Sequence, residues 1–141
     1  MGNVCDGALE RDGSRRVALV TGGSRGIGRA CAVGLAEDGY DIAVVYAGSV
    51  DAARETCEAC EAMGATARAY QCDVADPDAV NACVEAVLSD FGSIWALVNN
   101  AGITHDGLLM RMGDDAFDRV LDVNLKGTFN TTRALTKTFM R

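Results

Sequence analysis

The segment from Thr21 to Gly28 has the composition of a phosphate-binding loop. Gly22 allows a turn that residues with a Cβ atom disfavour, Gly26 lets the backbone approach a pyrophosphate, and Gly28 permits close packing of a helix on a sheet. An apolar run, residues 17–20, precedes the loop and predicts a buried strand, and helical spacing follows it. The N–H groups at the start of that helix would face the phosphates. This context predicts dinucleotide binding, with a purely structural glycine turn as the alternative.

The choice of dinucleotide depends on charge at the end of the second expected strand. NAD-binding folds usually place a carboxylate there, where it accepts hydrogen bonds from the ribose hydroxyls. Here the strand ends Tyr46-Ala47-Gly48-Ser49, without a carboxylate. Arg25 can instead pair with a 2′-phosphate, a charge-assisted bond of about 1.5–3 kcal/mol. We therefore expect NADP (NADPH), with a solvated loop charge as the alternative role of Arg25.

The periodicity of the chain predicts the elements that would position this loop. Short apolar runs alternate with segments whose apolar residues recur at helical spacing. The expected strands cover 17–20, 41–46, 66–72 and 94–98, and the expected helices cover 26–38, 49–63, 77–91 and 114–141. Right-handed crossovers then place helices on both faces of a parallel sheet. The fold class is α/β, a Rossmann-type doubly wound parallel sheet that ends after its fourth strand and the following helix.

Composition limits the other functions that the chain could have. Its 141 residues include 20 acidic and 13 basic side chains, a net charge of −7, which disfavours nucleic acid as a partner. No apolar run is long enough to span a bilayer, so we expect no membrane partner. The start lacks the apolar core of a signal peptide, so we expect a cytoplasmic protein with free thiols. Residues 1–14 are expected to form a flexible leader before a single domain over 15–141.

The spacing of Cys57 and Cys60 is that of a CxxC motif. The two cysteines fall on an expected helix, and no second Cys or His pair follows them. We therefore predict no metal site, although zinc or redox chemistry is the alternative for this spacing.

Several motifs in one order resemble the short-chain dehydrogenase/reductase family. They are Thr-Gly-x-x-x-Gly-Ile-Gly at 21–28, Asp73-Val74, Asn99-Asn100-Ala101-Gly102 and Asn124-Leu125-Lys126-Gly127. The resemblance extends from Arg16 to Arg141. It implies cofactor-binding roles along the pyrophosphate, at the adenine and at the ribose near the nicotinamide, for Gly22, Gly23, Ser24, Arg25, Gly26, Ile27, Gly28, Asp73, Val74, Asn100, Ala101 and Gly102.

For some of these residues, a purely structural role is the alternative to coenzyme binding or catalysis. Asp73 can cap a turn instead of binding adenine, and Asn99 is expected to tie strands together. Asn124 is the one catalytic residue that the resemblance implies, holding a helix kink and a proton-relay water, unless it is merely structural. His105 is expected to be an exposed loop residue.

Within the family, residues 100–112 are similar to those of 3-oxoacyl-[acyl-carrier-protein] reductases of fatty-acid synthesis, which usually have Arg where His105 stands. The resemblance implies a 3-oxoacyl thioester substrate, including one carried on acyl carrier protein, and hydride transfer to its 3-keto group. It also implies a homo-oligomer, a tetramer in the family, joined by an apolar face of the last helix: Val120, Leu121, Val123, Phe129, Leu135 and Phe139. Alternatively, this face covers its own sheet. Another alcohol, steroid or sugar dehydrogenase, or a stand-alone nucleotide-binding module, remains an alternative function.

The family's Tyr-x-x-x-Lys motif does not occur in these 141 residues. The residue four positions after Tyr40, Tyr46 or Tyr70 is valine in each case. A phenol with a pKa near 10 acts as an acid at neutral pH only when neighbouring groups lower its pKa, and these 141 residues offer no candidate phenol for that role. We therefore expect the chain to be the NADP-binding half of a reductase, inactive alone because the catalytic Ser and Tyr-x-x-x-Lys are missing.

Overall fold

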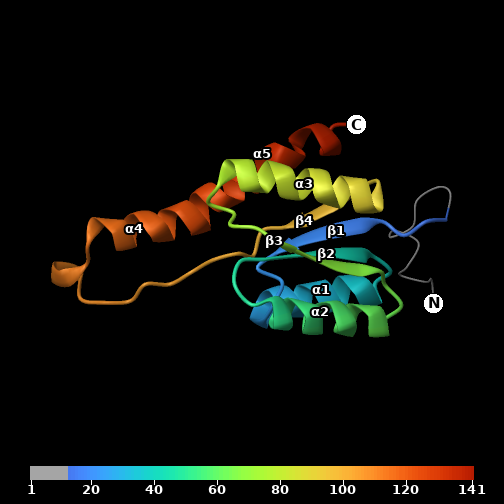
Figure 1. Ribbon diagram of the computed structural model, residues 1–141, viewed down its shortest axis with the longest axis horizontal. Helices are drawn as coiled ribbons and strands as arrows, with labels where there is room; N and C mark the ends of the chain where they lie inside the picture. Colours follow the sequence, from blue (N-terminus) through green and yellow to red (C-terminus); the bar gives the residue numbers. More distant parts are fainter. Residues whose placement is uncertain (1–12) are drawn as a thin grey trace, which may run out of the picture.

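The computed structural model describes residues 13–141 and contains a parallel sheet at its centre (Figure 1). The strands in this part of the chain are β1 (Val17–Thr21), β2 (Asp41–Tyr46), β3 (Ala67–Gln71) and β4 (Ala96–Val98), in the order β3-β2-β1-β4. Leu19 of β1 lies between Ala43 of β2 and Leu97 of β4. The order reverses on either side of β1, and all carboxyl ends share one edge. In open α/β sheets, ligands bind at this edge, next to the strand where the order reverses.

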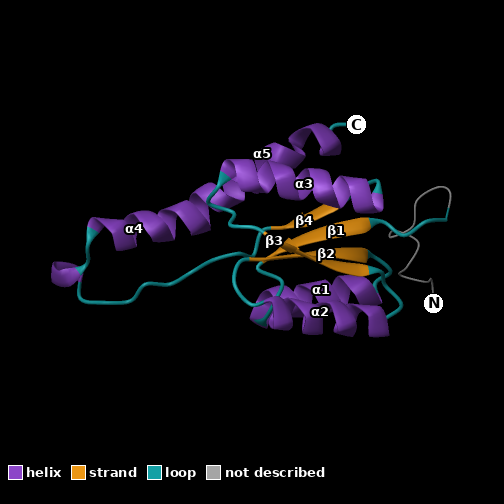
Figure 2. Ribbon diagram, in the orientation of Figure 1, coloured by secondary structure: helices purple, strands orange, loops and turns teal. Residues whose placement is uncertain are grey.

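Helices cover both faces of the sheet, as the alternating pattern predicts (Figure 2). One face carries α1 (Gly26–Glu37) and α2 (Val50–Ala62), and the other carries α3 (Pro77–Phe91) and α5 (Gly127–Phe139). The strand β1 serves both layers, since Val20 belongs to the apolar core with α1 and α2 and Leu19 to the core with α3 and α5. Nearly continuous apolar strands such as β1 and β2 are buried because helices lie on both sides.

Helix α3 shows how local sequence sets an element's bounds. Asp76 accepts hydrogen bonds from the N–H groups of Asp78 and Ala79, and Pro77 occupies the first helical position. The helix ends at Gly92, whose φ of 80° is the left-handed conformation that glycine adopts without strain. These bounds match the expected range of 77–91.

The expected helix over 114–141 is interrupted. It consists of α4 (Asp114–Leu121), a π-helical turn η3 (Asp122–Lys126) and α5. At the junction, a Cβ atom on Gly127 would lie 2.5 Å from Cγ2 of Val74, so the helix passes the β3–α3 loop at a distance that only glycine permits. Glycine in a helical pattern is tolerated, and for this reason periodicity alone did not reveal the break.

The expected apolar face of this last helical segment is in fact divided between two directions. Val123 and Leu135 are buried in the protein's own core, as the alternative prediction has it. Leu121, Phe129 and Phe139 are exposed. Val120 is half-buried. Leu135 and Phe129 both lie on α5, whose buried residues pack against α3, so the division runs between two faces of that helix.

Most of the expected leader lies in residues 1–12, outside the described residues; Gly13 and Ser14 are exposed. No helix within 13–141 combines the length and the apolar character that crossing a membrane requires.

Candidate functional site

The carboxyl ends of the strands open onto a groove of about 440 Å³. Its walls come from the loop after each strand, so residues far apart in sequence meet here. The lining includes most of the predicted positions, namely Gly22, Ser24, Arg25, Asp73, Val74, Asn100, Ala101 and Gly102. It also includes residues that the sequence analysis did not assign to coenzyme binding, namely Val45, Tyr46, Ala47, Gly48, Cys72, Ile103, Arg119 and Val123.

The glycine loop has the backbone geometry that its composition predicts. Gly22 has φ of 63° and Gly26 has φ of 55°, both left-handed. A Cβ atom on Gly28 would lie 2.1 Å from the carbonyl oxygen of Gly22 and 2.4 Å from Nδ2 of Asn100. The close approach at Gly28 is therefore to the loop and to the residue after β4, a stricter requirement than helix–sheet packing alone.

The start of α1 faces this loop without a capping side chain. Its N-cap is Arg25, which makes no side-chain hydrogen bond to the first turn, and that turn contains no acidic residue. The first N–H groups of a helix lack partners within the helix and attract anions. Gly23, Gly26, Ile27 and Gly28 do not line the groove wall, and the Ile27 side chain is exposed.

Asn100 holds the glycine loop against β4. Its Nδ2 donates to the Gly22 carbonyl at 3.0 Å, and the backbone N–H groups of Asn100 and Ala101 each donate to Oγ1 of Thr21 at 3.0 Å. Asn100 thus ties β1 to β4, the role expected for Asn99. Asn99 instead contacts α5, where Thr131 donates to its Oδ1 at 2.6 Å and its Nδ2 donates to Thr132 at 3.2 Å. The expectation for Asn99 is wrong because its side chain points to the helix layer.

The end of the groove beside Arg25 matches the chemistry of a phosphate. Ala47 and Gly48, directly after β2, also line the groove and provide no carboxylate. The Ser49 hydroxyl accepts from the Ala52 N–H at 3.2 Å and so caps α2. Arg25 is exposed, and Asp73, the only acidic residue among the described residues that line the groove, is paired with Arg119. The donors and charge present here fit a phosphorylated ribose.

Asp73 is held between a turn and a cation. Its Oδ1 accepts from the Ala75 N–H at 3.0 Å, the turn-capping role raised as an alternative. Its Oδ2 lies 3.2 Å from Nη2 of Arg119 on α4, and both side chains are about half exposed. Arg119 was missed because no motif accompanies it, and only the packing of α4 brings it to the groove.

Asn124 lies on the π-helical turn η3, the helical irregularity predicted for it, but outside the main groove. Its Oδ1 accepts from the Ile103 N–H at 2.8 Å, and its Nδ2 donates to the Ile103 carbonyl at 2.9 Å. It lines an adjoining hollow of about 280 Å³ together with the exposed His105. Ile103 lines both cavities, so Asn124 borders the groove through one shared residue.

Three cysteines, Cys57, Cys60 and Cys72, have thiol pKa values raised by their surroundings, so they are protonated at neutral pH. Cys72 lines the groove, and its hydrogen bond with Cys83, together with burial, raises the pKa of its thiol. Cys57 and Cys60 lie on the buried face of α2, where burial raises both pKa values to about 11; Cys60 and then Glu61 add to the shift at Cys57, and Glu61 adds to it at Cys60. Residues 13–141 contain no group of three or more His, Cys, Asp or Glu side chains that could hold a metal.

Comparison with known sequences identifies related enzymes. The chain is 52% identical over 124 residues to the 3-oxoacyl-[acyl-carrier-protein] reductase FabG of Staphylococcus aureus, covering 88% of this chain and 50% of that protein. It is 46% identical over 117 residues to an acetoacetyl-CoA reductase of Paracoccus denitrificans, covering 83% of this chain and 46% of that protein. The chain thus spans about half the length of these curated relatives.

Solved structures agree with the sequence comparison. A short-chain dehydrogenase/reductase of Serratia marcescens superposes with a TM-score of 0.84 at 36% identity, covering 89% of this chain and 51% of that one. An NAD⁺-bound xylitol dehydrogenase gives a TM-score of 0.84 at 36% identity, covering 89% of this chain and 48% of that one. The family model described as short chain dehydrogenase matches residues 16–141. This chain therefore belongs to the short-chain dehydrogenase family.

Proposed function

We propose that the chain is the cofactor-binding, N-terminal part of an NADPH-dependent 3-oxoacyl-[acyl-carrier-protein] reductase of fatty-acid synthesis. The observation that carries the choice of coenzyme is the lining of the groove, which combines Arg25 with Ala47 and Gly48 and has no carboxylate at the end of β2 for a free ribose 2′-hydroxyl. The relatives named as 3-oxoacyl and acetoacetyl-CoA reductases support the substrate class, a 3-oxoacyl thioester.

The residues along the groove divide the coenzyme between them. The N–H groups of the loop from Gly22 to Gly28 bind the pyrophosphate, and Arg25 binds the 2′-phosphate. Asp73 and Val74 flank the adenine, and residues 100–102 flank the ribose next to the nicotinamide. When bound, NADPH supplies the hydride that reduces the 3-oxo group. Asn124 would hold the backbone of Ile103 and a proton-relay water at the substrate end.

Exposed apolar side chains around the η3 turn, Leu121, Leu125 and Phe129, provide a surface for a homo-oligomer such as a tetramer. Because the 141 residues contain no Tyr-x-x-x-Lys, we expect no turnover from this chain alone. NADPH oxidation with an acetoacetyl thioester, dependent on this chain, would overturn that expectation. We further propose a cytoplasmic location.

The assignment of NADPH is tested by replacing Arg25. In Arg25→Ala, NADPH affinity should fall by about one to two decades because a charge-assisted bond is lost, while NADH affinity should change little. The matched control is Arg54→Ala, which removes an exposed arginine on α2 that does not line the groove. Equal changes in NADPH and NADH affinity for Arg25→Ala would refute the assignment.

NAD is the second candidate coenzyme, because the structurally similar xylitol dehydrogenase is NAD⁺-bound. The same titrations decide between the two. If the unmodified chain binds NADH more tightly than NADPH, the coenzyme is NAD and the chain resembles that dehydrogenase in specificity.

A further inference from the structure

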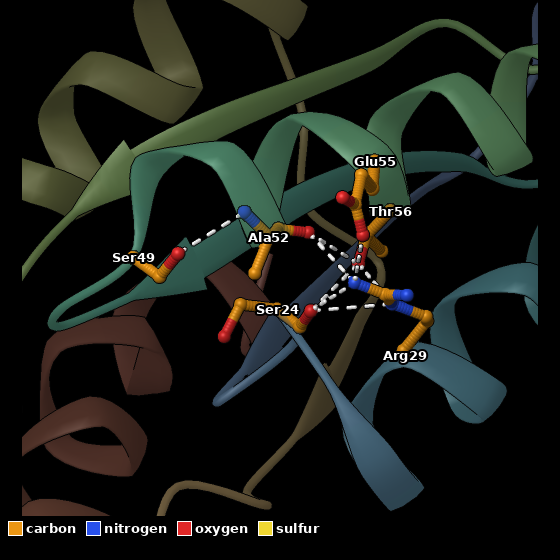
Figure 3. A network of polar contacts seen from close by, with 6 residues as sticks. All are labelled: Ser24, Arg29, Ser49, Ala52, Glu55 and Thr56. Atoms are coloured by element: carbon orange, nitrogen blue, oxygen red, sulfur yellow. Dashed lines mark hydrogen bonds and ion pairs between the residues drawn. The ribbon is translucent and has the colours of Figure 1, made fainter.

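The side chains of Arg29 and Thr56 both contact the carbonyl oxygen of Ser24, in the middle of the glycine loop (Figure 3). Arg29 donates to it from Nη2 at 2.7 Å and from Nε at 3.2 Å. The Thr56 hydroxyl of α2 lies 3.2 Å from the same oxygen and 3.0 Å from Nε of Arg29. Ser24 and Thr56 are both buried. The orientation of this carbonyl is therefore fixed by the protein before any ligand is bound.

Fixing the Ser24 carbonyl also fixes the N–H of Arg25. The two groups belong to one peptide unit, and in a planar trans peptide they point in opposite directions. With the carbonyl turned toward Arg29 and Thr56, the N–H of Arg25 is turned away from them. Ser24 and Arg25 both line the groove, so the same peptide aims a donor at the ligand and carries the cationic side chain.

Arg29 also joins the loop to the helix after β2. Its Nη2 lies 3.0 Å from the Ala52 carbonyl and 3.1 Å from Oε2 of Glu55, both in the first turns of α2. The loop before this helix contains Ala47 and Gly48, which line the groove as Arg25 does. One guanidinium thus links the glycine loop to the helix that follows this second part of the lining. Arg29 itself does not line the groove, and Glu55 partly balances its charge.

We infer that Arg29 and Thr56 are positioning residues for recognition of the coenzyme's 2′-phosphate. They act through the Ser24–Arg25 peptide and through the spacing between Arg25 and Gly48, and they touch no part of the ligand. This inference rests on the proposed function, since it assumes that a phosphorylated ribose binds at the Arg25 end. Their effect falls on the 2′-phosphate more than on the rest of the nucleotide.

The test uses Thr56→Val, which keeps the shape of the side chain and removes its hydroxyl, and Thr56→Ser, which restores it. Arg29→Lys keeps the charge but loses the paired donation to one oxygen. Dissociation constants are measured by calorimetry for 2′,5′-ADP and for 5′-AMP, which lacks the 2′-phosphate. The control is Arg54→Lys, an exposed arginine of the same helix. Thermal unfolding shows whether each variant is folded.

In Thr56→Val and Arg29→Lys, affinity for 2′,5′-ADP should fall about tenfold, a change that corresponds to about 1.4 kcal/mol. Affinity for 5′-AMP should fall by no more than about twofold, and Thr56→Ser should restore 2′,5′-ADP binding. Equal losses for the two ligands, or unchanged 2′,5′-ADP binding in folded variants, would contradict the positioning role. If the unmodified chain binds 5′-AMP and 2′,5′-ADP equally, the proposed NADPH function fails, and the inference fails with it.

Discussion

The two ends of the groove are held in place in different ways. At the glycine loop, Ser24 is fixed by Arg29 and Thr56, and Gly22 is fixed by Asn100. At the other end, residues 102–111 are exposed, and α4 extends away from the sheet (Figure 1). There the segment after β4 is held by the paired hydrogen bonds between Asn124 and Ile103.

This difference indicates that the described residues hold the glycine-loop end of the groove rigidly and the Asn124 end loosely. The coenzyme end has buried contacts between backbone and side chains on several elements, so we expect it to be preformed. The Asn124 end has few contacts and a large exposed apolar surface that includes Leu109, Met110, Phe117 and Leu125. Exposed segments with few buried contacts open at low free-energy cost. Substitutions at the first end should change binding, and those at the second should change local order.

The largest effect is expected at Gly28. A Cβ atom there would lie 2.1 Å from the Gly22 carbonyl, so Gly28→Ala must displace the loop. We expect NADPH binding to be lost and the free energy of unfolding to fall by about 1–3 kcal/mol. Gly34→Ala on the same helix is the control: its Cβ would meet no atom within 4 Å and it does not line the groove, so binding should not change and the free energy of unfolding should not fall. Fluorescence titration and urea unfolding measure both. Normal binding by Gly28→Ala would show that the coenzyme end is not rigid.

Asn124 tests whether the two ends are independent. Asn124→Ala removes both hydrogen bonds to Ile103, each worth about 0.5–1.5 kcal/mol. Amide hydrogen exchange should accelerate across residues 102–111 and remain unchanged in the glycine loop, with NADPH affinity preserved. In Asn124→Asp the acceptor for the Ile103 N–H is kept, so an intermediate rate is expected. Loss of coenzyme binding in Asn124→Ala would contradict the separation of the two ends.

Alkaline pH tests how well α2, the helix that carries Thr56, shields its buried Cys57 thiol from water. Burial raises the pKa of Cys57 on α2 to about 11, above its value in the unfolded chain. Its protonated thiol therefore stabilises the fold fully below about pH 9, and this contribution is lost as the pH rises through 11. Between pH 8 and 11, the free energy of unfolding should fall less steeply in Cys57→Ala, by on the order of 1 kcal/mol. Identical slopes, measured by urea unfolding with reductant present, would show that this thiol is not shielded.

The smallest effect is expected at Arg119, the contact between the two ends. Its ion pair with Asp73 is half exposed, so it contributes less than about 1 kcal/mol. Arg119→Ala should weaken NADPH binding by less than about fivefold, and the difference should shrink with added salt. A tenfold or greater loss of NADPH affinity would mean that binding beside Asp73 depends on α4.

The parts of the fold that local chemistry determines were predicted well. The glycine loop lies between β1 and α1, the strands are parallel, and Asp76, Pro77 and Gly92 set the bounds of α3. The resemblance to the short-chain dehydrogenase family is confirmed by the family match over residues 16–141. Coenzyme-binding roles for the individual residues remain predictions.

What the sequence did not reveal depends on contacts between distant elements. Periodicity did not show the break in the last helix, which only the family resemblance implied as a kink at Asn124; there Gly127 passes close to Val74, 53 positions earlier in the chain. Asn100 rather than Asn99 ties β4 to β1, and Asn99 contacts α5, because adjacent residues after a strand point to opposite sides. Arg29 and Thr56 belong to ordinary helical patterns, and only the packing of α1 on α2 brings them to the Ser24 carbonyl.

The central claim is that the groove at the carboxyl edge of the sheet binds a phosphorylated dinucleotide. A titration of the isotope-labelled chain with NADP⁺, followed by backbone amide chemical shifts, tests it most directly. We predict saturable shifts at residues 22–28, at Asp73 and Val74, and at residues 100–102, with no shifts around the exposed Phe129. Shifts that do not saturate, or that cluster at Leu125 and Phe129 while the glycine loop is unaffected, would contradict the account.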